Sequence, residues 1–343
     1  MRILFDIGHP AHVHQFRNII RGLEKMGHNV KITARDKDLT YQLLDDYGFS
    51  YEKLGKTKKG ILGKLAGTIS VDNKLYKIGK EFKPDVLVGG SGNIYVAHVG
   101  WFLGARSIIF EDSEPEQKIR IFYEPFVTNI CVPEGFKGKI NDKYIKFKGY
   151  KELAYLHPNN FTPDENVLSE AGLRKGEAFV LMRFVGWAAG HDTMNKGIDG
   201  DFKHRFVQEM EKHARVLISS EKPLPEDLKK YQILIPPTRI HSLLAFSKMF
   251  ITDGATMATE AALLGIPTVR TSSLVGTMSN FEELETKYGL MFCYKEPEKA
   301  LAKAIELIQS PDLHDSWKAK RDKLVSEKTD VAKFMIDTII GGN

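Results

Sequence analysis

Residues 249–270, MFITDGATMATEAALLGIPTVR, decide the fold of this chain. The apolar stretch from Met249 to Thr252 predicts a short buried strand, and the turn Asp253-Gly254-Ala255-Thr256 follows it. A helix of small residues with one carboxylate, Glu260, comes next, and Gly265-Ile266-Pro267 ends it before a second apolar stretch. This order of strand, turn, helix and strand is the repeating unit of a parallel α/β sheet.

The turn in this segment has the properties of an anion site. Because only small residues occupy it, the backbone N–H groups can approach a ligand closely at the positive end of the following helix, which suits a phosphate or diphosphate. Glu260 is placed to accept hydrogen bonds from sugar hydroxyls. The alternative is structural, since Asp-Gly turns are frequent at strand ends and Glu260 can be a helix carboxylate that faces solvent.

Apolar strands alternate with amphipathic helices along the rest of the chain, which predicts an α/β fold with helices on both faces of parallel, doubly wound sheets. The first series of predicted strands covers residues 3–7, 30–33, 86–88, 107–110 and 129–132. The second series covers residues 179–182, 215–219, 233–235, 250–252 and 268–270.

A polar, proline-punctuated stretch from Lys148 to Pro163 separates the two series and predicts a linker. We therefore expect a first domain at residues 1–150 and a second at residues 151–316. A final helix at 317–343 is expected to pack across both. Two such domains leave a cleft, with ligand loops at the carboxyl ends of both sheets.

Composition bounds the class of protein. With 343 residues, 27% of them charged and 42% hydrophobic, the chain has an ordinary globular balance. Cys131 and Cys293 stand far apart without a CxxC pattern, which argues against a disulfide scaffold and favours a reducing cytoplasm. No signal peptide is visible and no apolar run reaches the roughly 20 residues that a membrane span needs. We expect a cytoplasmic protein that is at most peripheral to a membrane.

Lysines gather in two segments. Residues 56–83 hold eight lysines against Asp72 and Glu81, and residues 137–151 hold six against Asp142. Such local charge can meet anionic lipid headgroups, nucleic acid or phosphorylated substrates, or it can be a solvated helix face. No recognition motif accompanies the lysines, so we expect no nucleic acid partner.

Three histidines follow the first strand, in Gly8-His9-Pro10-Ala11-His12-Val13-His14. Pro10 and the irregular spacing disfavour a zinc site of the HxxxH type, so no metal is expected. Histidine titrates near neutrality, so His9 and His12 are candidates for general acid/base work. The alternative is that they cap the helix or pack.

The next strands end in further polar groups. Gly90-Ser91-Gly92 is not a full GxGxxG motif and no Walker A lysine is present, which disfavours a nicotinamide or ATP site. The run from Glu111 to Glu116 holds four carboxylates. Either Glu111 or Glu114 can serve as a catalytic base, and the others suit a helix start.

The second half offers groups for a nucleotide. Arg183 ends a strand and suits a diphosphate, although a structural salt bridge is an equal alternative. The loop from Pro236 to His241 can frame a nucleobase through backbone groups beside Ile240.

Together these motifs resemble the GT-B superfamily. The block Thr252–Pro267 is similar to the nucleotide-sugar signature of non-hydrolysing UDP-N-acetylglucosamine 2-epimerases and MurG-like glycosyltransferases. The resemblance implies two Rossmann-like domains that face a central cleft, with a C-terminal helix that crosses back to the first domain. It also implies that Gly254, Ala255 and Thr256 contact a diphosphate and that Glu260 contacts the ribose. Ile240, His241, Asp253 and Arg183, chosen for their positions in the sequence, complete the expected nucleotide-sugar site.

Three segments resemble DUF354, an uncharacterised bacterial and archaeal family: GHPAHVHQF at 8–16, FEDSE at 110–114 and RFVGWAAGHD at 183–192. The epimerases differ from this chain in two loops. They carry an aspartate where it has Gly90-Ser91-Gly92, and a His-Arg-rich loop where it has Arg183-Phe184-Val185. Each lost acid/base group is worth on the order of 10²–10⁴-fold in rate, which favours transfer over epimerisation.

The resemblance therefore predicts a metal-independent glycosyltransferase of glycan or surface polysaccharide biosynthesis. It implies a UDP-sugar as substrate and no cofactor. His9, His12, Glu111 or Glu114 is expected to act as the base, while Arg183 and the 254–256 turn stabilise the departing UDP. The alternatives are an epimerase-like isomerase and a non-catalytic nucleotide-sugar binding protein. The acceptor can be lipid-linked, with segment 56–83 resting on a membrane.

Overall fold

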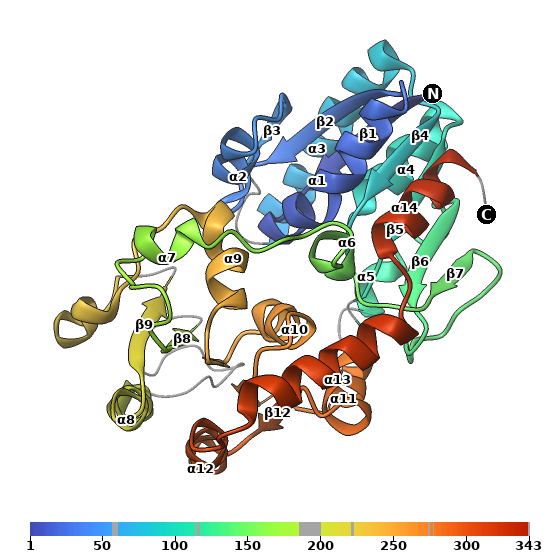
Figure 1. The fold of residues 1–343 in the computed structure, drawn as a ribbon. Coiled ribbons are helices and arrows are strands. Elements are labelled where there is room, and N and C mark those ends of the chain that lie inside the picture. The colour runs from blue at the N-terminus through green and yellow to red at the C-terminus, as the bar shows by residue number, and fades with distance from the viewer. Residues whose placement is uncertain are drawn as a thin grey trace. The chain divides into compact units, whose positions relative to one another are not determined.

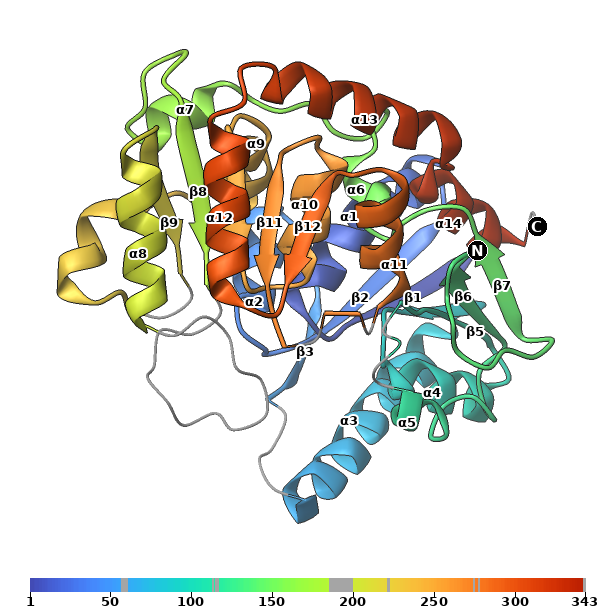
Figure 2. The ribbon, with the colours of Figure 1, turned by 90° about the horizontal axis from the view of Figure 1, so that it is seen from below.

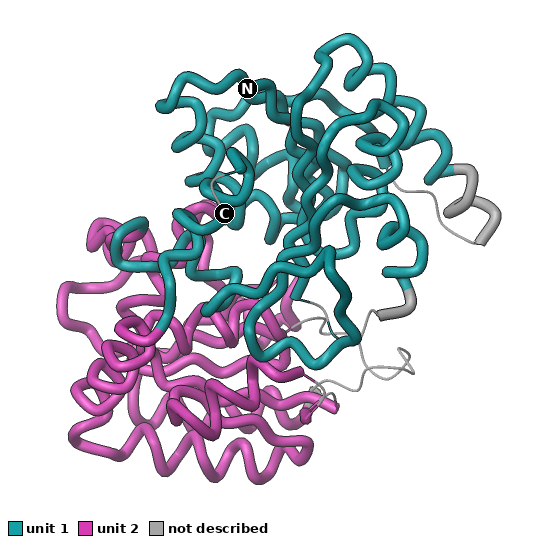
Figure 3. The backbone as a smooth tube through the Cα atoms, turned by 90° about the vertical axis from the view of Figure 1, so that its right-hand side faces the viewer, with its two compact units in different colours: residues 1–160, 328–343 teal, residues 161–327 magenta. Residues whose placement is uncertain are grey.

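The computed structural model describes residues 1–56, 61–112, 114, 117–184, 200–220, 223–273, 275–276 and 278–341, without the side chains of 61–66, 117–118 and 200. The chain divides into two compact units (Figure 3). Unit 1 comprises residues 1–160 and 328–343, and unit 2 comprises residues 161–327. The chain thus passes from unit 1 to unit 2 after Asn160 and returns after Glu327.

Unit 1 is built on a seven-stranded sheet in the order β3-β2-β1-β4-β5-β6-β7 (Figure 1). All the neighbouring strands pair in parallel. The strands are β1 (Arg2–Ile7), β2 (Asn29–Arg35), β3 (Glu52–Gly55), β4 (Val86–Gly89), β5 (Arg106–Phe110), β6 (Asn129–Pro133) and β7 (Tyr144–Phe147). Near-continuous apolar runs such as Ile3–Phe5 form the central strands because both faces of the sheet are covered.

Helices cover the two faces of this sheet. On one face α1 packs with α6 and α14, and Phe16 of α1 meets Phe5 of β1 with ring centroids 5.4 Å apart. On the other face α3 and α4 cover Leu4 and Leu87. The helices of unit 1 are α1 (Pro10–Lys25), α2 (Thr40–Asp46), α3 (Ile61–Phe82), α4 (Ile94–Leu103), α5 (Gln117–Arg120), α6 (Leu153–Leu156) and α14 (Val331–Ile340).

Unit 2 is built on a five-stranded parallel sheet in the order β12-β11-β10-β8-β9. Its strands are β8 (Phe179–Arg183), β9 (Arg215–Ser219), β10 (Met249–Thr252), β11 (Thr268–Thr271) and β12 (Met291–Tyr294). The predicted fold class, an α/β protein with two parallel sheets, is confirmed.

Helices also cover both faces of this second sheet. One face packs against α7, α9 and α10, with Phe250, Leu243 and Ala261 in the shared core. The helices α8 and α12 contact β9, β11 and β12 (Figure 2). The helices of unit 2 are α7 (Asn166–Glu170), α8 (Gly200–Glu211), α9 (Ile240–Ala245), α10 (Thr256–Leu263), α11 (Ser279–Glu282), α12 (Pro297–Ile308) and α13 (Leu313–Glu327). Shorter helical turns lie at Glu226–Tyr231, Pro237–Arg239 and Glu283–Lys287.

Several details differ from the sequence prediction. Strands β3, β7 and β12 were not predicted. Residues 233–235 are not a strand; Ile233 donates one bond to the Ile218 carbonyl at 3.0 Å, and the prolines that follow offer no N–H groups for a ladder. The predicted single helix at 317–343 is two helices, α13 and α14. Asp330 divides them because its carboxylate accepts bonds from the amides of Ala332 and Lys333, which caps a new helix. Among the described residues, no helix is long and apolar enough to cross a membrane.

Candidate functional site

The carboxyl ends of three strands of unit 2 lie level with one another. Thr252 at the end of β10 pairs in register with Arg183 of β8 and with Arg270 of β11. The Thr252 hydroxyl donates to the Arg183 carbonyl at 2.6 Å and accepts from the Gly254 amide at 2.9 Å. Thr252 therefore fixes the start of the predicted phosphate turn.

The turn leads into a helix start that has no side-chain cap. Ala255 is the N-cap residue of α10, no side chain caps the helix, and the first turn contains no acidic residue. The first amides of a helix have no acceptor within it, and they carry a partial positive charge. The start of α10 is therefore suited to an anion.

Arg270 lies beneath this turn and was missed by the sequence prediction. Its side chain is buried; Nε donates to the Gly254 carbonyl at 3.1 Å and the guanidinium stacks on the Phe281 ring at 4.6 Å. Nη1 is buried without a hydrogen-bond partner among the described residues. Burial lowers the pKa of Arg270, which reflects the cost of a desolvated charge. The signal in the sequence is an arginine inside an otherwise uncharged strand, Thr268–Thr271.

Glu260 is a buried group and does not face solvent. Its residue is 3% exposed, and Oε1 lies 3.0 Å from Nε2 of His241, which is 2% exposed. His241 is the second residue of α9, directly after Ile240. The pair therefore joins the predicted nucleobase loop to the predicted ribose-binding helix, and the solvent-facing alternative for Glu260 is wrong.

The other predicted groups of unit 2 lie at the same edge of the sheet. Arg183 donates through Nη1 to the Ser219 hydroxyl of β9 at 2.9 Å. Asp253 is partly exposed in the turn. Gly186, Trp187, His191 and Asp192, which belong to the segment 183–192 that resembles DUF354, lie outside the described residues.

In unit 1, His9 and His12 stand at the start of α1 with their ring centroids 6.0 Å apart. The Ala11 amide donates to Nδ1 of His9 at 3.1 Å, and the Gly8 amide donates to Nδ1 of His12 at 3.4 Å. Burial, followed by the charge of Lys37, lowers the pKa of His9 to about 4. Burial also lowers the pKa of His12 well below its ordinary value, with His9 and Arg35 adding to the effect.

These contacts set the tautomer of both rings. Because an amide N–H points at each Nδ1, that nitrogen must accept, and the proton of the neutral ring sits on Nε2. Each Nε2 is then a hydrogen-bond donor. His9 also caps α1, so the predicted alternative of a capping histidine describes part of its role.

The glycine loop after β4 accommodates His12. A Cβ placed on Gly90 would lie 2.5 Å from Cδ2 and Nε2 of the His12 ring, which real side chains do not tolerate. The glycine at this position therefore makes room for a histidine of the same unit.

Glu111 holds the same loop. Its carboxylate accepts bonds from the Ser91 hydroxyl, the Gly92 amide at 3.1 Å, the Tyr123 hydroxyl at 2.8 Å and the Asp112 amide at 3.0 Å. A carboxylate offers about four acceptor positions, and these four donors occupy them. Glu111 therefore suits a positioning role better than the role of a base.

Glu114, the other predicted base, is buried and accepts the Lys137 amide at 2.7 Å. Lys151 and Asp112 form a partly buried ion pair at 2.6 Å. Burial alone would lower the pKa of Lys151, but Asp112 and Glu152 raise it above its ordinary value. Lys151 therefore remains charged beside the two histidines.

A further buried carboxylate, Asp6 in β1, was not predicted from the sequence. It accepts from Thr33 at 2.9 Å, from Asn93 at 2.8 Å and from Arg35 at 3.2 Å. The guanidinium of Arg35 lies so close that a Cβ on Gly8 would touch it at 1.8 Å. Asp6 therefore ties β1, β2 and the start of α4 together. Among the described residues, no group of three His, Cys, Asp or Glu side chains is placed to hold a metal ion.

Comparison with known proteins places this geometry in a family. The family model "Protein of unknown function (DUF354)" matches residues 1–340. An uncharacterized protein of Methanocaldococcus jannaschii is 24% identical over 286 residues, which cover 78% of this chain and 80% of that protein.

Solved structures share the fold at low identity. The UDP-GlcNAc 2-epimerase of Neisseria meningitidis bound to UDP-GlcNAc matches with a TM-score of 0.69 and 15% identity, over 99% of this chain and 100% of that one. The Streptomyces sp. SF2575 glycosyltransferase SsfS6, complexed with thymidine diphosphate, matches with a TM-score of 0.64 and 12% identity, over 98% and 99%. The chain belongs to the DUF354 family and has a GT-B-like fold.

Proposed function

We propose that unit 2 binds the diphosphate of a nucleotide sugar at the turn from Asp253 to Thr256. The observation that carries this proposal is the uncapped start of α10 with Arg270 buried beneath it. Both groups offer positive charge and unused donors to the same anion. The Gly254 amide bonds Thr252, but the small side chains of Gly254, Ala255 and Thr256 leave room for a diphosphate to approach the first amides of α10.

Arg270 adds a reason for an anion to bind here. A buried guanidinium needs a partner because its charge has lost most of its contact with water. Nη1 has none among the described residues, and Nε holds the Gly254 carbonyl. A diphosphate would satisfy this donor and keep the turn in place. Arg183, on the far side of Thr252, is the second cation that we assign to the leaving diphosphate.

The nucleoside would lie over α9 and α10. We assign the ribose hydroxyls to Glu260 and the nucleobase to backbone groups beside Ile240. His241 holds the Glu260 carboxylate at 3.0 Å, so it orients the group that binds the ribose. Two solved structures of this fold contain UDP-GlcNAc and thymidine diphosphate, which supports a nucleoside diphosphate as the ligand class.

We further propose that the chain transfers the sugar to an acceptor without a metal ion, and that unit 1 holds the acceptor. His9 and His12 would act there as Nε2–H donors that position an acceptor or stabilise negative charge. With both Nδ1 atoms engaged and Glu111 saturated, Glu114 remains the candidate base. Epimerisation of the nucleotide sugar is the second candidate, because the epimerase of Neisseria meningitidis matches with a TM-score of 0.69.

The diphosphate site can be tested by calorimetry with UDP, dTDP and UDP-GlcNAc. We expect Arg270→Gln to weaken nucleoside diphosphate binding about 10-fold or more, since a charge-assisted bond to a buried cation contributes roughly 1.5–3 kcal/mol. Arg215→Gln is the matched control, because Arg215 begins β9 at the opposite end of the same sheet. Equal affinities for both variants and the parent protein would contradict the site.

The reaction can be tested separately by NMR on UDP-GlcNAc. An epimerase converts the nucleotide sugar without any acceptor, whereas a transferase releases UDP only when an acceptor is present or by slow hydrolysis. Tight binding with neither reaction, across a panel of acceptors, would leave a nucleotide-sugar binding protein and remove both catalytic proposals. Glu114→Gln should abolish transfer while it leaves UDP affinity unchanged.

A further inference from the structure

Unit 1 carries an exposed apolar patch that the nucleotide site does not use. We define the patch by six side chains from the end of α4, the segment after α5 and the loop before β7. They are Trp101, Phe102, Ile121, Phe122, Phe126 and Ile140, with exposed fractions between 37% and 69%. Five other large apolar residues are recorded as exposed: Leu234 in unit 2 and Met1, Met26, Leu39 and Ile69 in unit 1.

Contacts join the patch residues of α4 to those of the segment after α5. Trp101 contacts Phe102 and Phe126 with ring centroids 5.1 and 5.6 Å apart. His98 of α4 bonds the Phe122 carbonyl at 2.8 Å, which joins α4 to the segment after α5. Phe102 meets Tyr76 of α3 at 6.5 Å, and α3 lies beside α4 (Figure 2).

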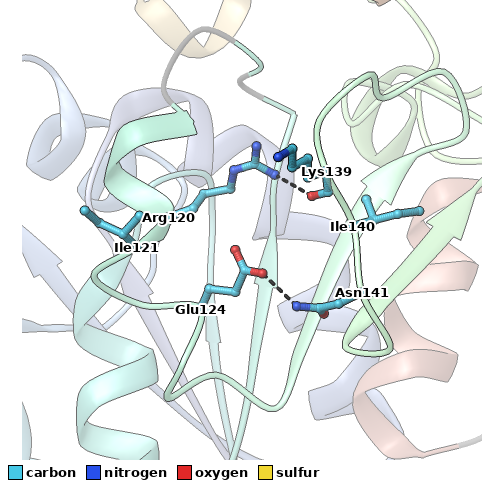
Figure 4. Close-up of a pocket in the computed structure, with 6 residues that line it drawn as sticks. All are labelled: Arg120, Ile121, Glu124, Lys139, Ile140 and Asn141. Atoms are coloured by element: carbon cyan, nitrogen blue, oxygen red, sulfur yellow. Dashed lines mark hydrogen bonds between the residues drawn. The ribbon is translucent and has the colours of Figure 1, made fainter.

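Two further features extend the patch at its ends. Exposed Ile69 stands seven residues before Tyr76, and therefore on the same face of α3. At the other end, Ile121 and Ile140 line a hollow of about 320 Å³ together with Arg120 and Lys139 (Figure 4).

Charges around the patch are unevenly compensated. Two carboxylates next to it are engaged within the unit: Asp72 pairs with His98 at 3.0 Å, and Glu124 accepts from Asn141 at 2.7 Å. By contrast, Lys80 and Lys139 are exposed and make no ion pair within the described part of the chain. Lys80 is four residues after Tyr76, on the same face of α3 as the patch. The patch therefore presents apolar side chains flanked by two exposed lysines, with one exposed carboxylate, Asp142, in the loop that carries Lys139.

We propose that this patch docks unit 1 on an anionic lipid bilayer. Exposed tryptophan and phenylalanine side chains favour the boundary between headgroups and acyl chains, and flanking lysines are attracted to anionic headgroups. A second copy of the chain is disfavoured as the occupant, because an isologous interface would place against each other two surfaces that both carry these lysines. The lysine-rich segment 56–83, first considered alone, contributes Lys80, while the apolar contact comes mainly from α4 and residues 121–126.

Sedimentation with vesicles tests the proposal. We expect the full-length protein to bind vesicles of phosphatidylcholine and phosphatidylglycerol, and to bind pure phosphatidylcholine far more weakly. Lys80→Gln with Lys139→Gln should reduce binding about five-fold for each lysine, from roughly 1 kcal/mol per cation near an anionic surface. Salt at about 1 M, where the Debye length is ~3 Å, should have a similar effect.

Apolar variants test the other half of the proposal. Trp101→Ser with Phe102→Ser should reduce vesicle binding at least 10-fold, while Leu234→Ser, at an 85% exposed site in unit 2, should not change it. Brominated lipid should quench the fluorescence of the parent protein, and Trp101→Phe should remove most of that quenching but keep the binding.

Circular dichroism spectra and UDP affinity of the variants separate loss of docking from loss of folding. Binding that does not depend on these residues would overturn the proposal. Self-association that the Trp101 and Phe102 changes abolish, with no vesicle binding by the parent protein, would instead assign the patch to a second copy.

Discussion

At the scale of single residues, the protonation of His9 and His12 in unit 1 depends on the groups that lie around them. His9 and His12 looked like acid/base candidates because histidine titrates near neutrality. In the folded protein each ring accepts an amide N–H at Nδ1; His12 is buried and His9 partly buried, beside Arg35, Lys37 and Lys151. Both rings are thus held neutral, with Nε2 as a donor. The sequence shows that the histidines follow the first strand. It does not show that Arg35, Lys37 and Lys151, which are distant in the chain, lie beside them in the fold.

The neutral state of His9 has a measurable consequence for stability. Its pKa is about 4 in the folded protein and 6.5 in the unfolded chain, so between these values the unfolded chain binds more protons. The free energy of unfolding should therefore fall as the pH drops from 6.5 to 4, by up to about 1.4 kcal/mol per pH unit for this group. His9→Asn keeps a capping side chain and removes the titration, so denaturation against pH should show a flatter slope.

A matched control is His314→Asn, because the His314 side chain is 85% exposed and meets water in both states. That variant should follow the parent profile. If His9→Asn also follows the parent profile, burial of His9 does not control its protonation.

At the scale of elements, the loop between β4 and α4 is shaped by its neighbours. Glu111 at the end of β5 accepts bonds from Ser91 and Gly92, and the ring of His12 rests on Gly90. A glycine-rich loop after a strand indicates a ligand site in the sequence, and here it serves packing as well. The packing role could not be predicted from the sequence, because the partners of the loop come from α1 and the end of β5, which are distant in the chain.

This packing predicts the effect of Gly90→Ala. The added Cβ would meet the His12 ring at 2.5 Å, so the free energy of unfolding should drop by about 1–3 kcal/mol. Combining it with His12→Ala removes the clash, and the double variant should be more stable than the sum of the single effects by at least ~0.5 kcal/mol. Strict additivity in denaturant titrations would show that the two residues do not touch.

At the scale of the whole molecule, Asp330 lies where the chain returns to unit 1. Its carboxylate caps α14 and accepts bonds from Asn159 and Asn160 at 3.1 and 3.0 Å, next to the point where the chain leaves unit 1. Burial opposes ionisation of Asp330, but these bonds lower its pKa overall. Asp330 therefore fastens both connections between the units to unit 1.

Replacing Asp330 should loosen this connection. Asp330→Ala should lower the free energy of unfolding by about 1–2 kcal/mol, whereas Asp330→Ser, which can still cap the helix, should lose less. Because the pKa of Asp330 is lowered in the folded state, its contribution is present above the unfolded pKa and is lost as the pH falls below it. Equal stability of the Ala and Ser variants at neutral pH would mean that the cap contributes nothing.

The sequence by itself determined the fold class, most strands of the two series and the turn before α10. Apolar periodicity and small residues indicate these features because each depends on a short stretch of the chain. It also carried the family resemblance, on motifs that extend from GHPAHVHQF to Pro267. Only the tertiary structure decided which polar groups meet. Arg270 became a candidate because it lies under Gly254, Glu111 became a positioning group because four donors reach it, and the apolar patch appeared because α4 and residues 121–126 lie side by side. Such contacts depend on packing between distant segments, which no local pattern encodes.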